Sequence, residues 1–244
     1  MKSKLIIIGF GKMGKHYAKL FSNAFEVGVI STCNIREEVE QTGARLIDNF
    51  ETAISSADYL LLSVPINALG NVITKINKYV RPDTIAIDVC SARVAAEKEL
   101  SRLKCKHFGL HGDIVIGTPD EKIIDFLSRG NNEFIYMSPE EHDKHNSIYG
   151  LVHFIGLALD DFLTEENKSA LAKSPAGMFI LNLVAHIKDN SPATYWETQM
   201  LNMITGEKRK EFIKALQNYD KLLGEGKSPF EFFVNDCVTT NDNE

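Results

Sequence analysis

A serine and a histidine follow two neighbouring predicted strands, where they could act on one substrate. Ser91 comes after the apolar run at residues 84–89, and His111 ends the run at residues 106–111. Because the carboxyl ends of parallel strands meet at one edge of a sheet, we expect both side chains in the same crevice. A neutral imidazole beside a hydroxyl suits removal of a substrate hydroxyl proton while a hydride leaves the same carbon. The alternative is that His111 is only a turn or capping residue, and spacing alone does not decide.

A hydride needs an acceptor, and the start of the chain carries a pattern that binds one. An apolar run at residues 5–8 leads into Gly9, Gly11 and Gly14, and a helical pattern follows at residues 13–21. In such a turn the glycines permit the bend, the approach of a pyrophosphate and close packing of helix on strand. The N–H groups of the helix start then face the phosphates. The predicted dinucleotide-binding residues are Gly9, Phe10, Gly11, Lys12, Met13 and Gly14. A glycine-rich turn that binds nothing is the alternative.

The end of the second predicted strand favours NADP over NAD. NAD-binding chains place an Asp or Glu here to hold the ribose 2′-hydroxyl. This chain offers Ser31, Thr32 and Arg36, with no acid before Glu37. Hydroxyls and a guanidinium suit a 2′-phosphate, because that group needs donors and positive charge. Alternatively, Arg36 is a solvated residue that opens a helix.

Short apolar runs alternate with helical segments over the first 137 residues. Eight strands are predicted, at residues 5–8, 25–30, 45–47, 59–64, 84–89, 106–111, 113–117 and 134–137. This alternation predicts an α/β fold with a Rossmann-type, doubly wound, mostly parallel sheet. Ser63, Val64 and Pro65 end the fourth strand and are expected to line the dinucleotide.

The pattern becomes wholly helical at Ser138, where Pro139 and two acids mark a helix start. Helices are predicted at residues 142–163, 175–188, 192–205 and 207–223. We therefore predict a dinucleotide-binding domain at residues 1–137 and an all-helical domain for substrate binding and dimerisation at residues 138–244. The tail carries an aromatic cluster that is a candidate docking element, formed by Phe230, Phe232 and Phe233.

Composition excludes several classes of function. The net charge of −6 and the lack of a Lys/Arg run argue against a nucleic-acid partner. The 4 cysteines show no CxxC spacing and read as reduced thiols. No apolar stretch is long enough to cross a bilayer, so we expect no membrane association and a cytoplasmic location. His142 and His145 stand beside Glu141 without an apparent third ligand, so we predict no metal site and expect both histidines on the surface.

Taken in order along the chain, these motifs resemble the prephenate and arogenate dehydrogenases of tyrosine biosynthesis. The matching segments are residues 9–14, 63–65, 88–93, 138–143, 153–159 and 174–175. In this resemblance His111 falls at the catalytic histidine, His153 at the histidine of the first long helix, and Arg93 where a Lys is usual.

The resemblance implies oxidative decarboxylation of a cyclohexadienol that bears a ring carboxylate. His111 takes, or strongly hydrogen-bonds, the ring hydroxyl proton, hydride passes to the nicotinamide, and loss of CO₂ makes the ring aromatic. Ser91 orients His111, the hydroxyl or the nicotinamide carboxamide. The resemblance also implies a homodimer through the helical domain, and the nearly all-apolar segment at residues 178–185 favours the same.

Two departures from the family pattern concern the substrate. The usual His-Pro-Met-x-Gly is His111-Gly112-Asp113 with a shorter loop, and no Arg follows Ser174-Pro175. The remaining candidates for holding a substrate carboxylate are Arg93, His153 and Lys173, with a partner subunit as another source. Two other functions therefore stay open: an NADP-dependent imine or hydroxyacid reductase, and a dinucleotide-binding protein without dehydrogenase activity.

Overall fold

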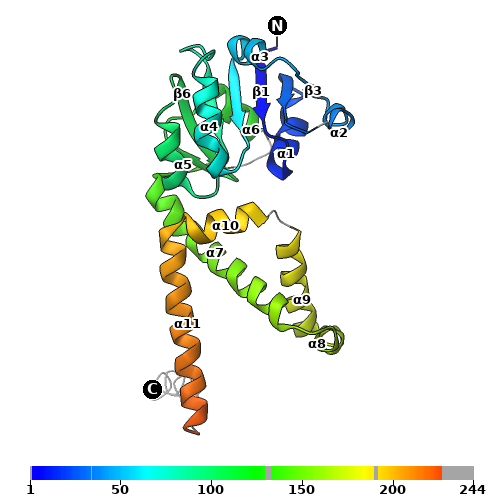
Figure 1. The fold of residues 1–244 in the computed structure, drawn as a ribbon, viewed down its shortest axis with the longest axis vertical. Coiled ribbons are helices and arrows are strands. Elements are labelled where there is room, and N and C mark those ends of the chain that lie inside the picture. Colours follow the sequence, from blue (N-terminus) through cyan, green and yellow to red (C-terminus); the bar gives the residue numbers. More distant parts are fainter. Residues whose placement is uncertain (1, 34, 130–132, 190–191, 227–244) are drawn as a thin grey trace, which may run out of the picture.

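A single eight-stranded sheet forms one half of the molecule, and helices alone form the other (Figure 1). The computed structural model describes residues 2–33, 35–129, 133–189 and 192–226. The strands are β1 (Lys4–Ile8), β2 (Glu26–Ile30), β3 (Arg45–Leu46), β4 (Tyr59–Leu62), β5 (Ile85–Asp88), β6 (Lys106–His111), β7 (Ile114–Ile116) and β8 (Ile135–Met137). Their order is β3-β2-β1-β4-β5-β6-β7-β8, and only the β6–β7 pair is antiparallel. The predicted doubly wound, mostly parallel sheet is confirmed.

The central strands are mostly apolar because helices cover both faces of the sheet. In β1, Leu5 and Ile7 belong to one buried cluster, while Ile6 and Ile8 belong to the cluster on the opposite face. The first cluster is closed by α1 (Lys12–Phe21) and α6 (Glu121–Ser128), and the second by α3 (Phe50–Ser56), α4 (Ile66–Ile76) and α5 (Arg93–Leu100). The short helix α2 (Arg36–Glu40) completes this half of the molecule.

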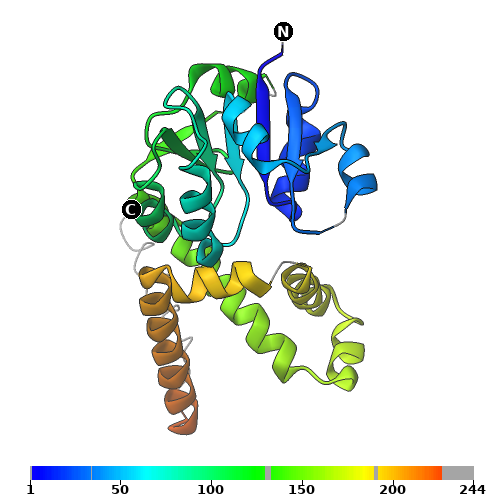
Figure 2. The same ribbon diagram turned by 45° about the horizontal axis from the view of Figure 1, so that its top comes forward.

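The helical region follows directly after β8. It contains α7 (Pro139–Phe162), α8 (Glu165–Leu171), α9 (Pro175–Lys188), α10 (Pro192–Met200) and α11 (Met203–Gly224). Ser138 begins α7 with a capping box: its hydroxyl accepts from the Glu141 N–H at 3.1 Å, and its own N–H donates to the Glu141 carboxylate at 2.8 Å. Figure 2 shows α10 beneath the carboxyl edge of the sheet, with α11 extending away from it.

Some helix boundaries differ from the prediction. The third predicted helix was expected to reach residue 205, but α10 ends at Met200 because Asn202 begins α11, its side chain accepting from the N–H groups of Ile204 and Thr205. The short helix α8 was not predicted. The aromatic cluster at residues 230–233 lies outside the described residues. Within them, no single helix is long and apolar enough to cross a membrane; α7 and α8 meet that test only as a pair bent by 116°.

Candidate active site

A cleft of about 870 Å³ opens at the carboxyl edge of the sheet, beside the ends of β1, β2 and β4. Among the residues predicted to bind the dinucleotide, it is lined by Gly9, Phe10, Gly11, Ser31, Thr32, Ser63, Val64 and Pro65. The other four, Lys12, Met13, Gly14 and Arg36, do not line it. The cleft therefore brings together three separate predicted segments.

The glycine turn has the geometry that a pyrophosphate requires. Gly9 has a φ of +94°, and a Cβ there would lie 2.2 Å from the Ser63 carbonyl oxygen. A Cβ on Gly14 would lie 2.3 Å from the Gly9 carbonyl oxygen, whereas one on Gly11 would meet nothing within 4 Å. No side chain caps the start of α1, so its first N–H groups are left for a ligand or solvent. The turn thus fits the phosphates of a dinucleotide.

Arg36 is not among the residues that line this cleft, although its neighbour Ile35 is. It opens α2, and its guanidinium lies 3.3 Å from the Asp48 carboxylate. Its charge is therefore already paired outside the cleft. Arg36 is the first residue of α2, as in the alternative interpretation of a solvated residue that opens a helix.

Next along the same edge, His111 joins a chain of three polar side chains. Its Nδ1 lies 2.9 Å from Nε2 of His142, and Nδ1 of His142 lies 3.1 Å from Oδ1 of Asp143. The same Asp143 carboxylate accepts from the backbone N–H groups of Arg93 at 2.7 Å and Val94 at 3.1 Å. His142 and Asp143 are both buried.

The hydrogen bonds of this chain assign the proton on each imidazole. The Asp143 carboxylate can only accept, so His142 donates from Nδ1, and its Nε2 is then the acceptor of a neutral ring. His111 must donate from Nδ1 to that nitrogen. Its own Nε2 is consequently left without a proton, which is the state that a general base requires.

The surroundings of His111 keep its ring neutral. Burial lowers the pKa of His111 to about 4, with further lowering by His142 and by the Arg93 guanidinium. The neighbouring acids Asp143 and Asp113 act in the opposite direction but are weaker. At neutral pH the imidazole is therefore unprotonated, as a general base must be before it reacts.

Ser91 provides an unused hydrogen-bonding group close to this chain. Its carbonyl oxygen accepts from the Asn146 side chain of α7 at 3.2 Å, while its Oγ is buried without a hydrogen-bond partner among the described residues. Buried hydroxyls are nearly always satisfied, so a bound molecule is the natural partner. The structure thus brings Ser91 and His111 to adjacent strand ends, as predicted.

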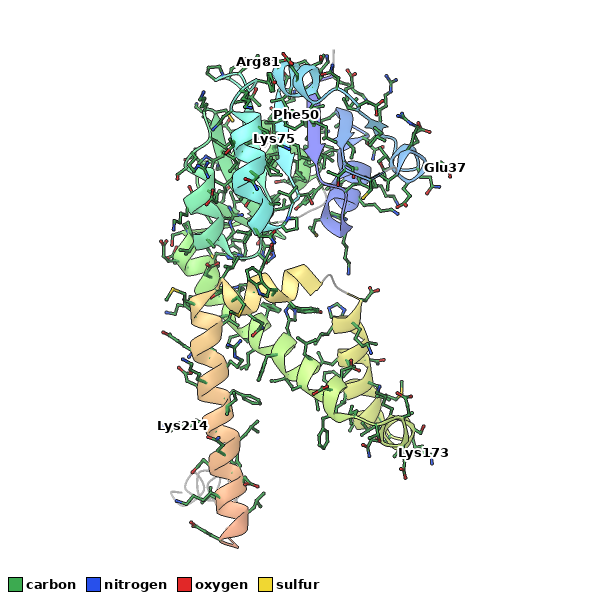
Figure 3. The ribbon with its side chains drawn as sticks, viewed as in Figure 1. Glu37, Phe50, Lys75, Arg81, Lys173 and Lys214 are labelled. Carbon is green, nitrogen blue, oxygen red and sulfur yellow. The ribbon has the colours of Figure 1, made fainter. Side chains whose placement is uncertain are left out.

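The predicted carboxylate-binding residues are not brought together in this chain. The Arg93 side chain is wholly buried and pairs with Asp88, while its Nε and Nη2 have no hydrogen-bond partner among the described residues. Lys173 lies in the turn between α8 and α9, at the end of the helical region away from the sheet (Figure 3). His153 is half-buried on α7, with its Nδ1 unpartnered among the described residues and its ring 5.0 Å from that of Tyr195.

The prediction that His142 lies on the surface is wrong. Its exposed fraction is 0%, because α7 packs on α5 and turns His142 toward β6. One signal was available in the sequence: residues 142, 146 and 153 are spaced four and seven apart, which places them on one face of a helix. That face contains His153, which the family resemblance had already selected. His145 is exposed, as predicted.

Glu197 on α10 is a further residue that sequence reasoning missed. Its Oε1 accepts from the Ile66 N–H at 2.5 Å, at the start of α4 and directly after Pro65. It is 7% exposed, and burial raises the pKa of its carboxyl above the ordinary value. This bond ties α10 to the turn at residues 63–65.

The fold and site define a dinucleotide-dependent dehydrogenase with an all-helical region beside its nucleotide-binding sheet. The family model described as the prephenate dehydrogenase nucleotide-binding domain matches residues 19–146, which is just over half of the chain. The chain therefore belongs to the prephenate dehydrogenase family.

Solved structures agree on the fold. Prephenate dehydrogenase from Aquifex aeolicus, in complex with hydroxyphenyl propionate and NAD⁺, is 21% identical, with a TM-score of 0.74 and coverage of 97% of this chain and 96% of that one. Arogenate dehydrogenase from Synechocystis is 16% identical, with a TM-score of 0.68 and coverage of 96% and 97%. A 3-hydroxyisobutyrate dehydrogenase from Mycobacterium tuberculosis is 13% identical, with a TM-score of 0.51 and coverage of 86% and 100%. No curated protein sequence matches the chain.

Proposed function

We propose that this protein is a prephenate or arogenate dehydrogenase that uses NADP in preference to NAD. The observation that carries the proposal is the chain His111–His142–Asp143, which leaves Nε2 of His111 free to accept a proton. The unpartnered Ser91 hydroxyl and the dinucleotide cleft lie at neighbouring strand ends. The nicotinamide, when bound, supplies the hydride acceptor.

The site residues can carry the substrate through hydride loss, proton transfer and decarboxylation, as follows. Nε2 of His111 takes the ring hydroxyl proton as hydride leaves the carbinol carbon, which becomes a ketone. The positive charge that forms on His111 is shared through His142 with the Asp143 carboxylate. The bond between ring and carboxylate then breaks, CO₂ leaves, and its electron pair makes the ring aromatic as a phenolate. That phenolate takes the proton back from His111.

A substrate of this class also carries carboxylates that need donors. Of the three predicted candidates, His153 is on the same face of α7 as His142 and Asn146, which makes it the strongest within this chain. The Ser91 hydroxyl and a partner subunit are further sources.

The test is dinucleotide reduction measured by absorbance, with prephenate and arogenate each offered NADP and NAD. We expect turnover with at least one of the two substrates and a higher kcat/KM for NADP. Tight NADP binding without turnover of either would favour the non-catalytic alternative. Turnover of an imine or a hydroxyacid instead would favour the reductase alternative.

We also propose a homodimer through the helical region. On α11 the partly exposed apolar residues Ile213, Leu216, Tyr219 and Leu223 recur every three or four positions and form one stripe. In both ribbon views the outer part of α11 projects from the molecule (Figures 1 and 2). Isolated helices are marginal in water, so a second copy that covers this stripe would stabilise α11.

Sedimentation equilibrium tests the dimer directly. We expect a mass of two chains at micromolar concentration, and a shift toward one chain when Leu216 and Leu223 are both changed to Lys. The matched control changes the exposed Lys210 and Lys214 of the same helix to Gln, which should leave the dimer intact. A wild-type monomer at that concentration would contradict the proposal.

We also propose a cytoplasmic location. The cysteines Cys33, Cys90 and Cys105 are all free thiols, which is compatible with a reducing compartment.

A further inference from the structure

The dinucleotide cleft continues along helix α4, beyond the glycine turn. Four α4-side residues line it at a helical spacing, Ala68, Val72, Lys75 and Tyr79. On the opposite wall stand Ile35 and Phe50, and the rings of Phe50 and Tyr79 are in edge contact with centroids 6.4 Å apart. This part of the cleft is largely apolar and partly aromatic, which suits an adenine ring.

The positive charge in this slot comes from the last turn of α4 and the residues just after it. Lys75 and Lys78 are the cationic side chains among the described residues that line the cleft, and none of those lining residues is an Asp or Glu. Within the described part of the chain, no ion pair or hydrogen bond is found for either lysine ammonium. Two lysine ammonium groups in a cleft that also exposes the hydroxyls of Ser31 and Thr32 attract a phosphate, and none of the described residues that line the cleft offers the carboxylate that NAD-binding chains use for the ribose 2′-hydroxyl.

The direction of α4 places Lys75 better than Lys78 for this contact. The helix begins at Ile66, on the cofactor edge of the sheet, and runs away from that edge. Side chains of a helix lean toward its N-terminus, and Lys75 lies one turn nearer the start of α4 than Lys78 while lining the same cleft as Ile30 and Ser31. Figure 3 shows Lys75 on the exposed side of α4, with Phe50 nearby. Arg36, the residue selected from the sequence, is instead held by Asp48.

We propose that Lys75, supported by Lys78, binds the 2′-phosphate of NADP, so that α4 and not α2 sets the choice between NADP and NAD. This inference rests on the cofactor preference in the proposed function. It does not depend on the identity of the substrate.

Binding measurements on the full-length protein test the inference without catalysis. Dissociation constants for NADP and NAD are measured by calorimetry in wild type and in Lys75→Ala, Lys75→Arg, Lys78→Ala and Arg36→Ala. We expect Lys75→Ala to weaken NADP binding by about 10-fold or more and to change NAD binding by less than about twofold. Lys75→Arg should restore most of the affinity, and Lys78→Ala should have a smaller effect. The matched control is Lys19→Ala, an exposed lysine on α1 outside the cleft, which should change neither constant.

The outcomes separate this inference from the proposed function. If Arg36→Ala abolishes the NADP preference and Lys75→Ala leaves it intact, the inference is wrong and the cofactor preference stands. If wild type binds NAD as tightly as NADP, both the inference and the preference fall, while dehydrogenase activity with NAD is unaffected. If Lys75 controls NADP binding and no turnover is found, the inference stands and the catalytic proposal fails.

Discussion

Changing His111 to Asn is expected to lower kcat by about 100-fold or more. The Asn side chain can still donate a hydrogen bond toward His142, but it cannot accept the substrate proton at the position of Nε2. Dinucleotide binding should be almost unchanged, because His111 is the last residue of β6 and the cleft lies beside β1, β2 and β4. The measurement is steady-state kcat together with the NADP dissociation constant. A variant with near-normal kcat would remove His111 from the mechanism.

The pH dependence of kcat/KM is expected to reflect the low pKa of His111. An ordinary histidine base would lose activity below about pH 6.5, but burial lowers the pKa of His111 to about 4, so activity should persist through pH 6.

The lowered pKa of His111 also makes the stability of the fold depend on pH. Between pH 6.5 and about 4 the unfolded chain binds a proton on this residue and the folded chain does not, so stability falls as pH falls through that window. Denaturant unfolding at pH 7 and pH 5 measures this loss, and His111→Asn should reduce it. An acidic limb of the kcat/KM profile near pH 6.5 would contradict the low pKa of His111.

The sheet could be predicted from the sequence because its signal is local. A run such as residues 5–8, apolar at every position, is needed only where both faces of a strand are covered, and the glycines that follow it have few other uses. Ser91 and His111 could be placed for the same reason, since parallel topology fixes where strand ends meet. The order of motifs along the chain then identified the family, and the family model agrees.

The residues that were misplaced depend on contacts distant in sequence. Arg36 is held by Asp48, 12 positions away, and the position of that acid follows from the short strand β3. Arg93 was selected from the family pattern, but its buried pairing with Asp88 at the end of β5 is visible only in the fold. Lys75 lies on an exposed helix face, which in sequence resembles any solvated lysine. Its relevance comes from the cleft that α4 forms with β1 and β2.

His142 is the most consequential of the residues that the sequence misplaced. It stands in the polar first turns of α7, where a histidine is usually solvated, and its partner His111 lies 31 positions earlier. Packing of α7 on α5, fixed by the bonds from Asp143 to the Arg93 and Val94 N–H groups, brings the two rings together. Since His142 accepts the Nδ1 proton of His111, it selects the ring form whose Nε2 is the base. It is therefore a positioning residue for catalysis.

Changing His142 to Leu is expected to lower kcat by roughly 100-fold, because His111 then loses the partner that fixes its ring orientation and proton position. The pH profile should also change. Burial is the main cause of the lowered pKa of His111 and His142 a smaller one, so removing His142 should move the acidic limb of kcat/KM upward by only part of the shift. His142→Gln, which keeps an acceptor for His111, should recover part of kcat. The matched control is His145→Leu, an exposed histidine one turn along α7, which should alter neither kcat nor the pH profile. Should His142→Leu fold normally and lower kcat without moving the acidic limb, His142 would support the structure of the site and not the protonation state of His111.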